Sequence, residues 1–145
     1  MSEARRAAGC VILRRTDRAI LLLRNRKLGH WGLAKGHRDA GDRTDIACAL
    51  REVREELGPA RIVLVPGFRE ELRYTIPAGT YKRQEEPIEK VVVMLLAWWP
   101  DGAEPALSKE HAEARWVTLE EMARLVEHDS LREVIARAVA FAAGR

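Results

Sequence analysis

Residues 36–58 read GHRDAGDRTDIACALREVREELG, a glycine-rich turn followed by a helical pattern that ends in a cluster of acids. At roughly 100° per residue, the side chains of Glu52, Glu55 and Glu56 fall within about 100° of one another on such a helix. The apolar residues recur at helical spacing, which predicts a face that packs on a core. That predicted core face consists of Ile46, Ala49, Leu50, Val53 and Leu57.

The crowded carboxylates permit two interpretations. Like charges one turn apart repel each other, so three acids on one stripe are costly unless a cation lies among them. Carboxylate oxygens suit Mg²⁺ or Mn²⁺. The alternative is a solvated acidic face that arginines neutralise, for example through an ion pair between Arg51 and Glu55 four residues apart.

The turn before the helix favours a binding site over a plain acidic face. Gly36 and Gly41 permit backbone angles that other residues resist, so the loop can fold tightly over the helix. Thr44 or Asp45 can cap the first turn, and Gly58-Pro59 ends the last. A tight loop beside an acidic helix is a suitable place for a metal-bound polyphosphate.

The stretch resembles the Nudix box, G-x5-E-x7-R-E-U-x-E-E-x-G-U, in which U is aliphatic. The matching residues are Gly36, Arg51, Glu52, Val53, Glu55, Glu56 and Gly58. Asp42 stands where the family usually has Glu, eight residues instead of seven separate it from Arg51, and Pro59 replaces the last aliphatic residue. An extra residue within the helix would rotate the acids by roughly 100°, so we expect it in the loop near residues 43–44. The resemblance implies that Asp42, Arg51 and Gly58 have structural roles, with a contact between Asp42 and Arg51.

Composition predicts one domain spanning residues 1–145. The chain is 47% hydrophobic and 32% charged, which is typical of a soluble globular protein. The longest apolar run, Val91 to Trp99, is too short to cross a bilayer and predicts a buried central strand. The net charge of +3 favours polyphosphates but is too small to indicate nucleic acid. Two cysteines without metal-like spacing, and no evident signal peptide, favour a cytoplasmic protein.

Alternation of strand and helix patterns predicts an α/β/α sandwich with a central mixed sheet, which is also the arrangement that the Nudix resemblance implies over nearly the whole chain. The expected strands are residues 8–15, 19–24, 31–35, 61–65, 68–75, 88–99 and 114–117. Capping boxes at Thr118–Glu121 and Ser130–Glu133 predict two further helices. The second would present Leu131, Val134, Ile135, Ala138 and Ala142 to the core.

Short segments around the box resemble the asymmetric diadenosine tetraphosphate hydrolases. They are Ala8-Gly9-Cys10 with Arg14-Arg15, His30-Trp31, Ala34-Lys35-Gly36-His37, Gly67–Tyr74, Lys90-Val91-Val92, Leu107–His111 and Arg115-Trp116 with Leu119–Glu121. Two positions depart from the family, because Ala34 replaces a proline and Ala114 stands where an aromatic residue often contacts the base. Tyr81 or Trp31 are the candidates to replace that aromatic residue.

By this resemblance, Lys35, Gly36, His30 and Lys90 would bind substrate phosphates. Tyr74 would stack on adenine, and Glu110 would join Glu52, Glu55 and Glu56 as a metal ligand. Each has a structural alternative: cross-strand packing for Tyr74, a strand-edge charge for Lys90 and a solvated loop for Glu110. The remaining histidines, His37, His111 and His128, show no ligand spacing and are expected at the surface.

The chemistry expected is metal-dependent hydrolysis of a phosphoanhydride, with Glu52, Glu55 and Glu56 as the catalytic carboxylates. Mg²⁺ or Mn²⁺ would activate water, and Glu55, Glu52 or Glu110 would accept its proton. The preferred substrate is a dinucleoside tetraphosphate, cleaved to a nucleoside triphosphate and a monophosphate. The alternatives are a pyrophosphohydrolase of nucleoside triphosphates, including oxidised ones, or of RNA 5′ ends, and a non-catalytic nucleotide-binding module. The sequence leaves open whether the protein is a monomer or a homodimer.

Overall fold

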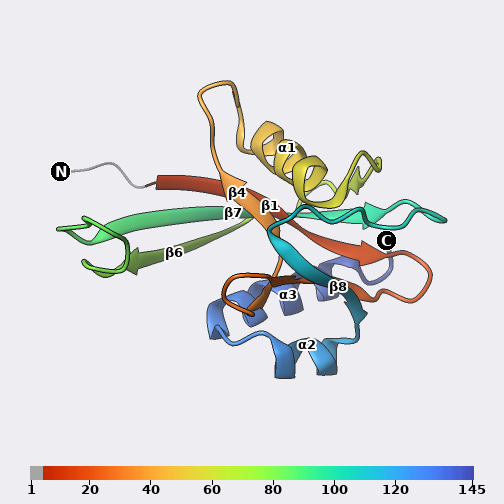
Figure 1. Ribbon diagram of the computed structural model, residues 1–145. Coiled ribbons are helices and arrows are strands. Elements are labelled where there is room, and N and C mark those ends of the chain that lie inside the picture. The colour runs from red at the N-terminus through yellow and green to blue at the C-terminus, as the bar shows by residue number, and fades with distance from the viewer. Residues whose placement is uncertain (1–4) are drawn as a thin grey trace.

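The computed structural model describes residues 5–145, and in it a mixed sheet is enclosed between helices (Figure 1). The strands are β1 (Arg5–Arg14), β2 (Ile20–Asn25), β3 (Trp31–Gly32), β4 (Ala34–His37), β5 (Val63–Leu64), β6 (Glu70–Ile76), β7 (Ile88–Trp99) and β8 (His111–Val117). The helices are α1 (Asp45–Leu57), α2 (Leu119–Leu125) and α3 (Asp129–Ala142). No helix among residues 5–145 is long and apolar enough to span a bilayer.

The parallel pair of β1 and β7 forms the centre of the sheet. β2, β3, β5, β6 and β8 extend the sheet through antiparallel pairs, and β4 pairs with β1. Residues 91–99 of β7 are buried continuously, as the apolar run predicted for a strand covered on both faces. The mixed sheet that the sequence predicted is therefore confirmed.

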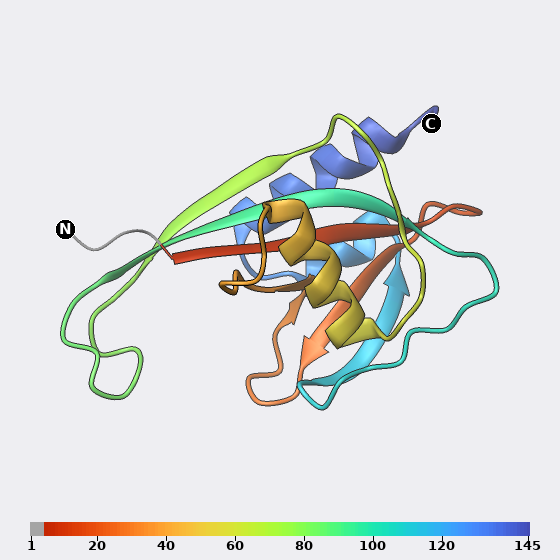
Figure 2. The ribbon, with the colours of Figure 1, turned by 90° about the horizontal axis from the view of Figure 1, so that it is seen from above.

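Alternating side chains of the central strands divide the core into two layers. Even-numbered residues of β7 between 92 and 98 pack beneath α2 and α3, whereas odd-numbered residues between 93 and 99 pack beneath α1. Figure 2 shows α1 in front of the strands and α3 behind them. The layered α/β/α arrangement is confirmed, and residues on the two faces of β1 and β7 can be assigned by this alternation.

The ends of α1 follow the sequence prediction. The Thr44 hydroxyl accepts a hydrogen bond from the Ala47 amide at 3.0 Å, and Gly58 ends the helix with φ 89°. However, Ile46 and Leu50 are 49% and 38% exposed, so their assignment to the core face was wrong. The helix buries a narrower stripe, which consists of Cys48, Ala49, Val53, Glu56 and Leu57.

Two other local predictions need correction. The expected strand over residues 31–35 is divided at Leu33, because β3 pairs with β2 whereas β4 pairs with β1. The capping box at Ser130 is also wrong, since α3 begins at Asp129 and no side chain caps its His128 end. The Arg132 guanidinium donates to the carbonyls of Val126 and Glu127, which follow α2, and does not replace the missing cap of α3. The box at Thr118–Glu121 is confirmed, with both reciprocal bonds present.

Candidate metal and phosphate site

The acidic end of α1 separates its carboxylates by burial. Glu56 is only 4% exposed and the Glu52 side chain 14%, whereas the Glu55 side chain is 55% exposed. Burial, followed by the charge of Glu56, raises the pKa of Glu52. The carboxylate of Glu55 accepts a hydrogen bond from Arg51 at 3.0 Å. For Glu55, the structure therefore agrees with the alternative of a solvated acid that an arginine neutralises. Glu52 and Glu56 are thus the two acids that the fold turns inward.

Gly36 admits the Glu52 carboxylate to the edge of β4. A Cβ atom at position 36 would lie 2.1 Å from Cδ of Glu52 and 2.2–2.3 Å from its oxygens. The absence of a side chain, rather than an unusual backbone angle, is what this position requires. The glycine that opens the motif therefore fixes how closely strand and acid approach.

Arg51 ties the turn to the helix. Its guanidinium donates to both Asp42 oxygens, at 2.9 Å and 2.8 Å, and to the Glu52 carboxylate at 3.0 Å. These bonds hold the pKa of Asp42 well below its usual range. The contact expected between Asp42 and Arg51 is present, and α1 begins only at Asp45, so the additional residue lies in the loop and leaves the helical positions of the acids unchanged.

A second group of ligand atoms lies where the loop before β8 meets the end of α1. One ligand atom each from Glu56, Glu110 and His111 lie within 4.8 Å of one another. The His111 Nε2 atom lies 2.5 Å from Oε1 of Glu56. The loop is held there because the Ser108 amide donates to the Glu56 carbonyl, and the His111 amide donates to the Ser108 carbonyl.

His111 is only 8% exposed, so its placement at the surface was wrong. The sequence offered one usable signal, which is its position next to Glu110, itself a metal candidate. Its burial follows from tertiary pairing, since β8 begins at His111 opposite Asn25 of β2. His37 and His128 are exposed, as expected.

The arrangement fits a hard divalent cation. Oε2 of Glu56 is buried yet has no hydrogen-bond partner among residues 5–145, which is costly for a carboxylate. Glu110 supplies a further carboxylate within this group, and Glu52 supplies another close enough for the charge of Glu56 to raise its pKa; oxygens of this type are the ligands that Mg²⁺ and Mn²⁺ prefer. A cation here would satisfy the unpaired oxygen and relieve the repulsion between Glu52 and Glu56.

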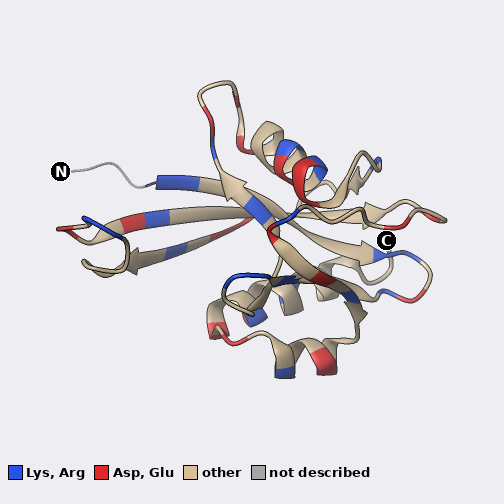
Figure 3. Ribbon diagram, viewed as in Figure 1, with Lys and Arg blue, Asp and Glu red and all other residues tan. Residues whose placement is uncertain are grey.

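Lys35 lies between the acids and a group of cations. Burial lowers its pKa, while Glu56 and Glu52 oppose that shift. The blue segment of β4 lies beside the acidic end of α1 in Figure 3. Lys90, opposite Arg5 in the β1–β7 pair, has its pKa lowered to about 8 by burial first and then by Lys35 and Arg5.

Tyr74 and Lys90 are register partners across β6 and β7, and the Lys90 ammonium lies 5.9 Å from the Tyr74 ring centroid. Tyr74 is 42% exposed, which leaves its ring accessible next to the cation. By strand alternation, Arg5, Lys90 and Tyr74 all lie on the sheet face that α2 and α3 cover further along. The fold thus aligns an aromatic ring and two cations on one face of the sheet, and Lys35 is the cation that lies near both Lys90 and the acids.

His30 contacts an acidic residue. Its Nδ1 atom lies 3.3 Å from the carboxylate of Glu127, in the connection between α2 and α3. Ala114 faces Leu23 within the β2–β8 pair, and Trp31 lies beneath the Arg115 guanidinium at 4.9 Å. Tyr81 is 53% exposed in the β6–β7 hairpin.

Known proteins are similar to this chain in sequence and in fold. The model of the NUDIX domain matches residues 3–138. The chain is 34% identical to the mouse asymmetrical bis(5′-nucleosyl)-tetraphosphatase over 144 residues, covering 91% of each protein, and 33% identical to the pig protein of that name with the same coverage. The structure of a Caenorhabditis elegans Ap4A hydrolase binary complex superimposes with a TM-score of 0.82 at 26% identity, over 98% of this chain and all of that one.

Proposed function

The chain belongs to the NUDIX family, and from this premise we propose that it hydrolyses a phosphoanhydride bond of a dinucleoside polyphosphate, with diadenosine tetraphosphate as the preferred substrate. The products would be ATP and AMP. The observation that carries this proposal is the inward pair Glu52 and Glu56, with the unpaired Glu56 oxygen beside Lys35. The tetraphosphatase relatives and the Ap4A hydrolase structure support the choice of substrate.

Glu52, Glu56 and Glu110, with His111 beside Glu56, would hold the divalent cation, Mg²⁺ or Mn²⁺. When bound, this cation would neutralise phosphate oxygens and lower the pKa of a bound water. Glu55 points to solvent and to Arg51, so it would join the ligands only by leaving that ion pair.

The protein's own groups would position and stabilise the substrate. Lys35 would contact the phosphate oxygens next to the acids, and Lys90 would contact oxygens further along the polyphosphate. Both ammonium groups would stabilise the negative charge that develops on the phosphates in the transition state. Tyr74 would stack on the adenine next to Lys90. A carboxylate of the cluster would accept the proton from the attacking water, and single Glu→Gln variants of Glu52, Glu55 and Glu110 would identify which one. His30 would contact a phosphate only by leaving its contact with Glu127.

We also propose a cytoplasmic location, supported by two cysteines that are buried and free, Cys10 and Cys48.

The test is to incubate the protein with Mg²⁺ and a panel of dinucleoside polyphosphates, nucleoside triphosphates, a 5′-triphosphorylated RNA and ADP-ribose. Diadenosine tetraphosphate should give the highest kcat/KM, with ATP and AMP as products. Faster release of pyrophosphate from a nucleoside triphosphate or from the RNA end would favour the pyrophosphohydrolase alternative. Binding without turnover of any compound would favour the non-catalytic module.

Glu56→Gln gives the matched test of the site. It should lower kcat by about 10³-fold or more, because it removes a charge that acts directly at the reaction centre, while the unfolding midpoint stays near that of the wild type. Glu104→Gln, the same change at an exposed loop residue, should have no effect. Wild-type turnover in Glu56→Gln would remove this residue from the site.

A further inference from the structure

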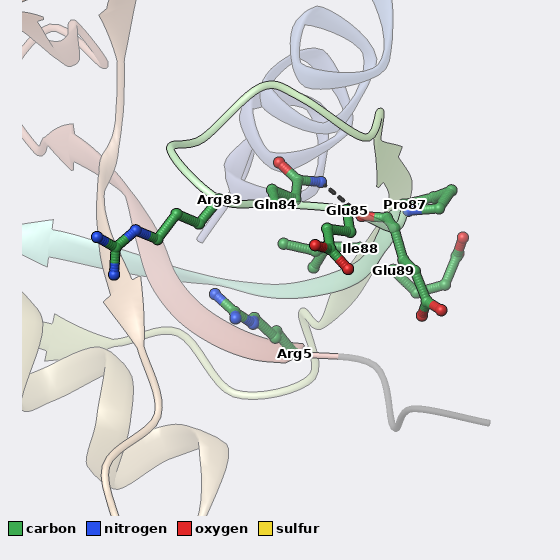
Figure 4. A pocket seen from close by; sticks show the side chains of 8 residues that line it. Arg5, Arg83, Gln84, Glu85, Pro87, Ile88 and Glu89 are labelled. Carbon is green, nitrogen blue, oxygen red and sulfur yellow. Dashed lines mark hydrogen bonds between the residues drawn. The ribbon is translucent and has the colours of Figure 1, made fainter.

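A pocket outside the acidic cluster lies under the hairpin that joins β6 to β7. It has a volume of about 380 Å³, which is within the usual range for small-molecule sites. It is lined by Arg5, Arg83, Gln84, Glu85, Glu86, Pro87, Ile88 and Glu89, and we call it the hairpin pocket. Figure 4 shows Arg5 and Arg83 on one side of this pocket and Glu89 on the other.

The hairpin is held in one shape by Gln84. Its side-chain amide donates to the carbonyls of Pro77 at 2.9 Å and Glu86 at 2.8 Å, and its side-chain oxygen accepts from the Tyr81 amide at 3.0 Å. Arg83, just before it, has φ 63°, a conformation that non-glycine residues rarely adopt. The bonds of Gln84 therefore hold the strained Arg83 backbone and present its side chain to the pocket.

The two arginines of the pocket are available for a ligand. Among residues 5–145, neither Arg5 nor Arg83 forms an ion pair through its guanidinium, although three glutamates line the same pocket. Glu89 is engaged elsewhere, since it accepts a hydrogen bond from the Thr75 hydroxyl at 2.7 Å. The pocket thus offers two free guanidinium groups together with unpaired carboxylates.

The hairpin pocket continues the row of phosphate-binding candidates. Arg5 is the register partner of Lys90, one strand spacing away, or about 4.8 Å. Ile88 lies two residues before Lys90 on the same face of β7, opposite Ile76 of β6. β1 lies between β4 and β7, so a chain of phosphates that contacts Lys35 and Lys90 can also contact Arg5, which lines the hairpin pocket.

We propose that the hairpin pocket binds the second nucleotide of a dinucleoside polyphosphate, the one whose base is not stacked on Tyr74. This inference rests on the proposed function and specifies which substrates the site selects. Arg5 binds the last phosphate of the chain, and the planar guanidinium of Arg83 stacks on the base. Glu85 accepts hydrogen bonds from the ribose hydroxyl groups, as carboxylates do in other nucleotide sites.

The glutamates of the pocket contribute to the selection. A bare terminal phosphate carries more negative charge than a phosphate esterified to a nucleoside, so Glu85 and Glu86 repel it more strongly. A nucleoside, by contrast, is neutral and offers hydroxyl donors to the same carboxylates. The pocket should therefore prefer a capped polyphosphate to an uncapped one of equal length.

The experiment compares kcat/KM for diadenosine tetraphosphate and adenosine 5′-tetraphosphate, which differ only in the second nucleoside. Arg83→Asn removes the guanidinium while tolerating the positive φ. We expect it to lower kcat/KM by about tenfold for the dinucleotide and to leave the value for adenosine tetraphosphate nearly unchanged. Arg73→Asn is the matched control, because Arg73 lies on β6 outside the pocket and pairs with Glu71. It should leave both values unchanged.

Equal losses for the two substrates, or no loss for either, would overturn the assignment of the pocket. Dissociation constants of both compounds for the wild-type protein in EDTA give an independent measure, and equal values would also overturn it. If the wild type binds the dinucleotide more tightly but does not cleave it when Mg²⁺ is present, the proposed function fails and the pocket assignment stands. Unfolding midpoints of both variants should match the wild type.

Discussion

Replacement of Gly36 by alanine tests the geometry on which the acidic site depends. The new Cβ would lie 2.1 Å from Cδ of Glu52, whereas ordinary contact begins near 3.4 Å. The carboxylate must therefore retreat by about 1 Å, and a displacement of that size at a reaction centre can lower the rate about 10²-fold. Because the displaced group is the end of a flexible side chain, we expect the unfolding midpoint to stay within about 3 °C of the wild type.

Steady-state hydrolysis of diadenosine tetraphosphate would give kcat, and calorimetric titration with Mn²⁺ would give the metal affinity. Gly36→Ala should lower both values. Gly41→Ala is the matched control in the same turn, because a Cβ there meets no atom within 4 Å and the backbone is not in the left-handed region. Wild-type kcat and Mn²⁺ affinity in Gly36→Ala would refute the claim that Glu52 must lie against β4.

Three further predictions concern charge and helix ends. The value of kcat/KM should fall as the pH rises through about 8. Burial lowers the pKa of Lys90 to about that value, and deprotonation of Lys90 removes a charge that binds phosphate. Lys90→Arg should abolish this fall. Thr44→Ala should lower the free energy of unfolding by about 1 kcal/mol in urea titrations, whereas Ser130→Ala should change it by less than about 0.5 kcal/mol because Ser130 caps no helix. Asp42→Asn should lower the unfolding midpoint at pH 7. The bonds from Arg51 depress the pKa of Asp42 below its ordinary value of 3.8, so the ionised carboxylate stabilises the folded wild type at any pH above 3.8. In calorimetry, the difference in midpoint between wild type and variant should disappear as the pH falls through the folded-state pKa of Asp42.

Local patterns predicted most elements of the fold. The boundaries of β7, the end of α1 at Gly58 and the apolar face of α3 follow from periodicity and from glycine and capping chemistry, which act within a few residues. The predictions that failed concern competition between local and distant partners. The expected strand over residues 31–35 divides at Leu33 because its two parts pair with β2 and β1, and Ser130 caps no helix because α3 begins one residue earlier, at Asp129.

In the candidate site, too, some residues were predictable from local sequence and others depend on distant segments. The spacing of Glu52 and Glu56 in one helix follows from helical geometry, so the sequence was sufficient to predict them together. His111 was misjudged because its environment depends on which strands pair and where loops return, and it is buried against Glu56.

The amino-acid pattern alone therefore determined the family resemblance, the acidic helix and the buried central strand, because helix geometry and hydrophobic spacing are properties of contiguous residues. Only the tertiary structure decided which acids are buried, that His111 joins them, and that Arg5 lies next to Lys90 and lines the hairpin pocket together with Arg83. The physical reason is that burial and the proximity of charges depend on chain segments that are distant in sequence, and no local pattern encodes the distance between them.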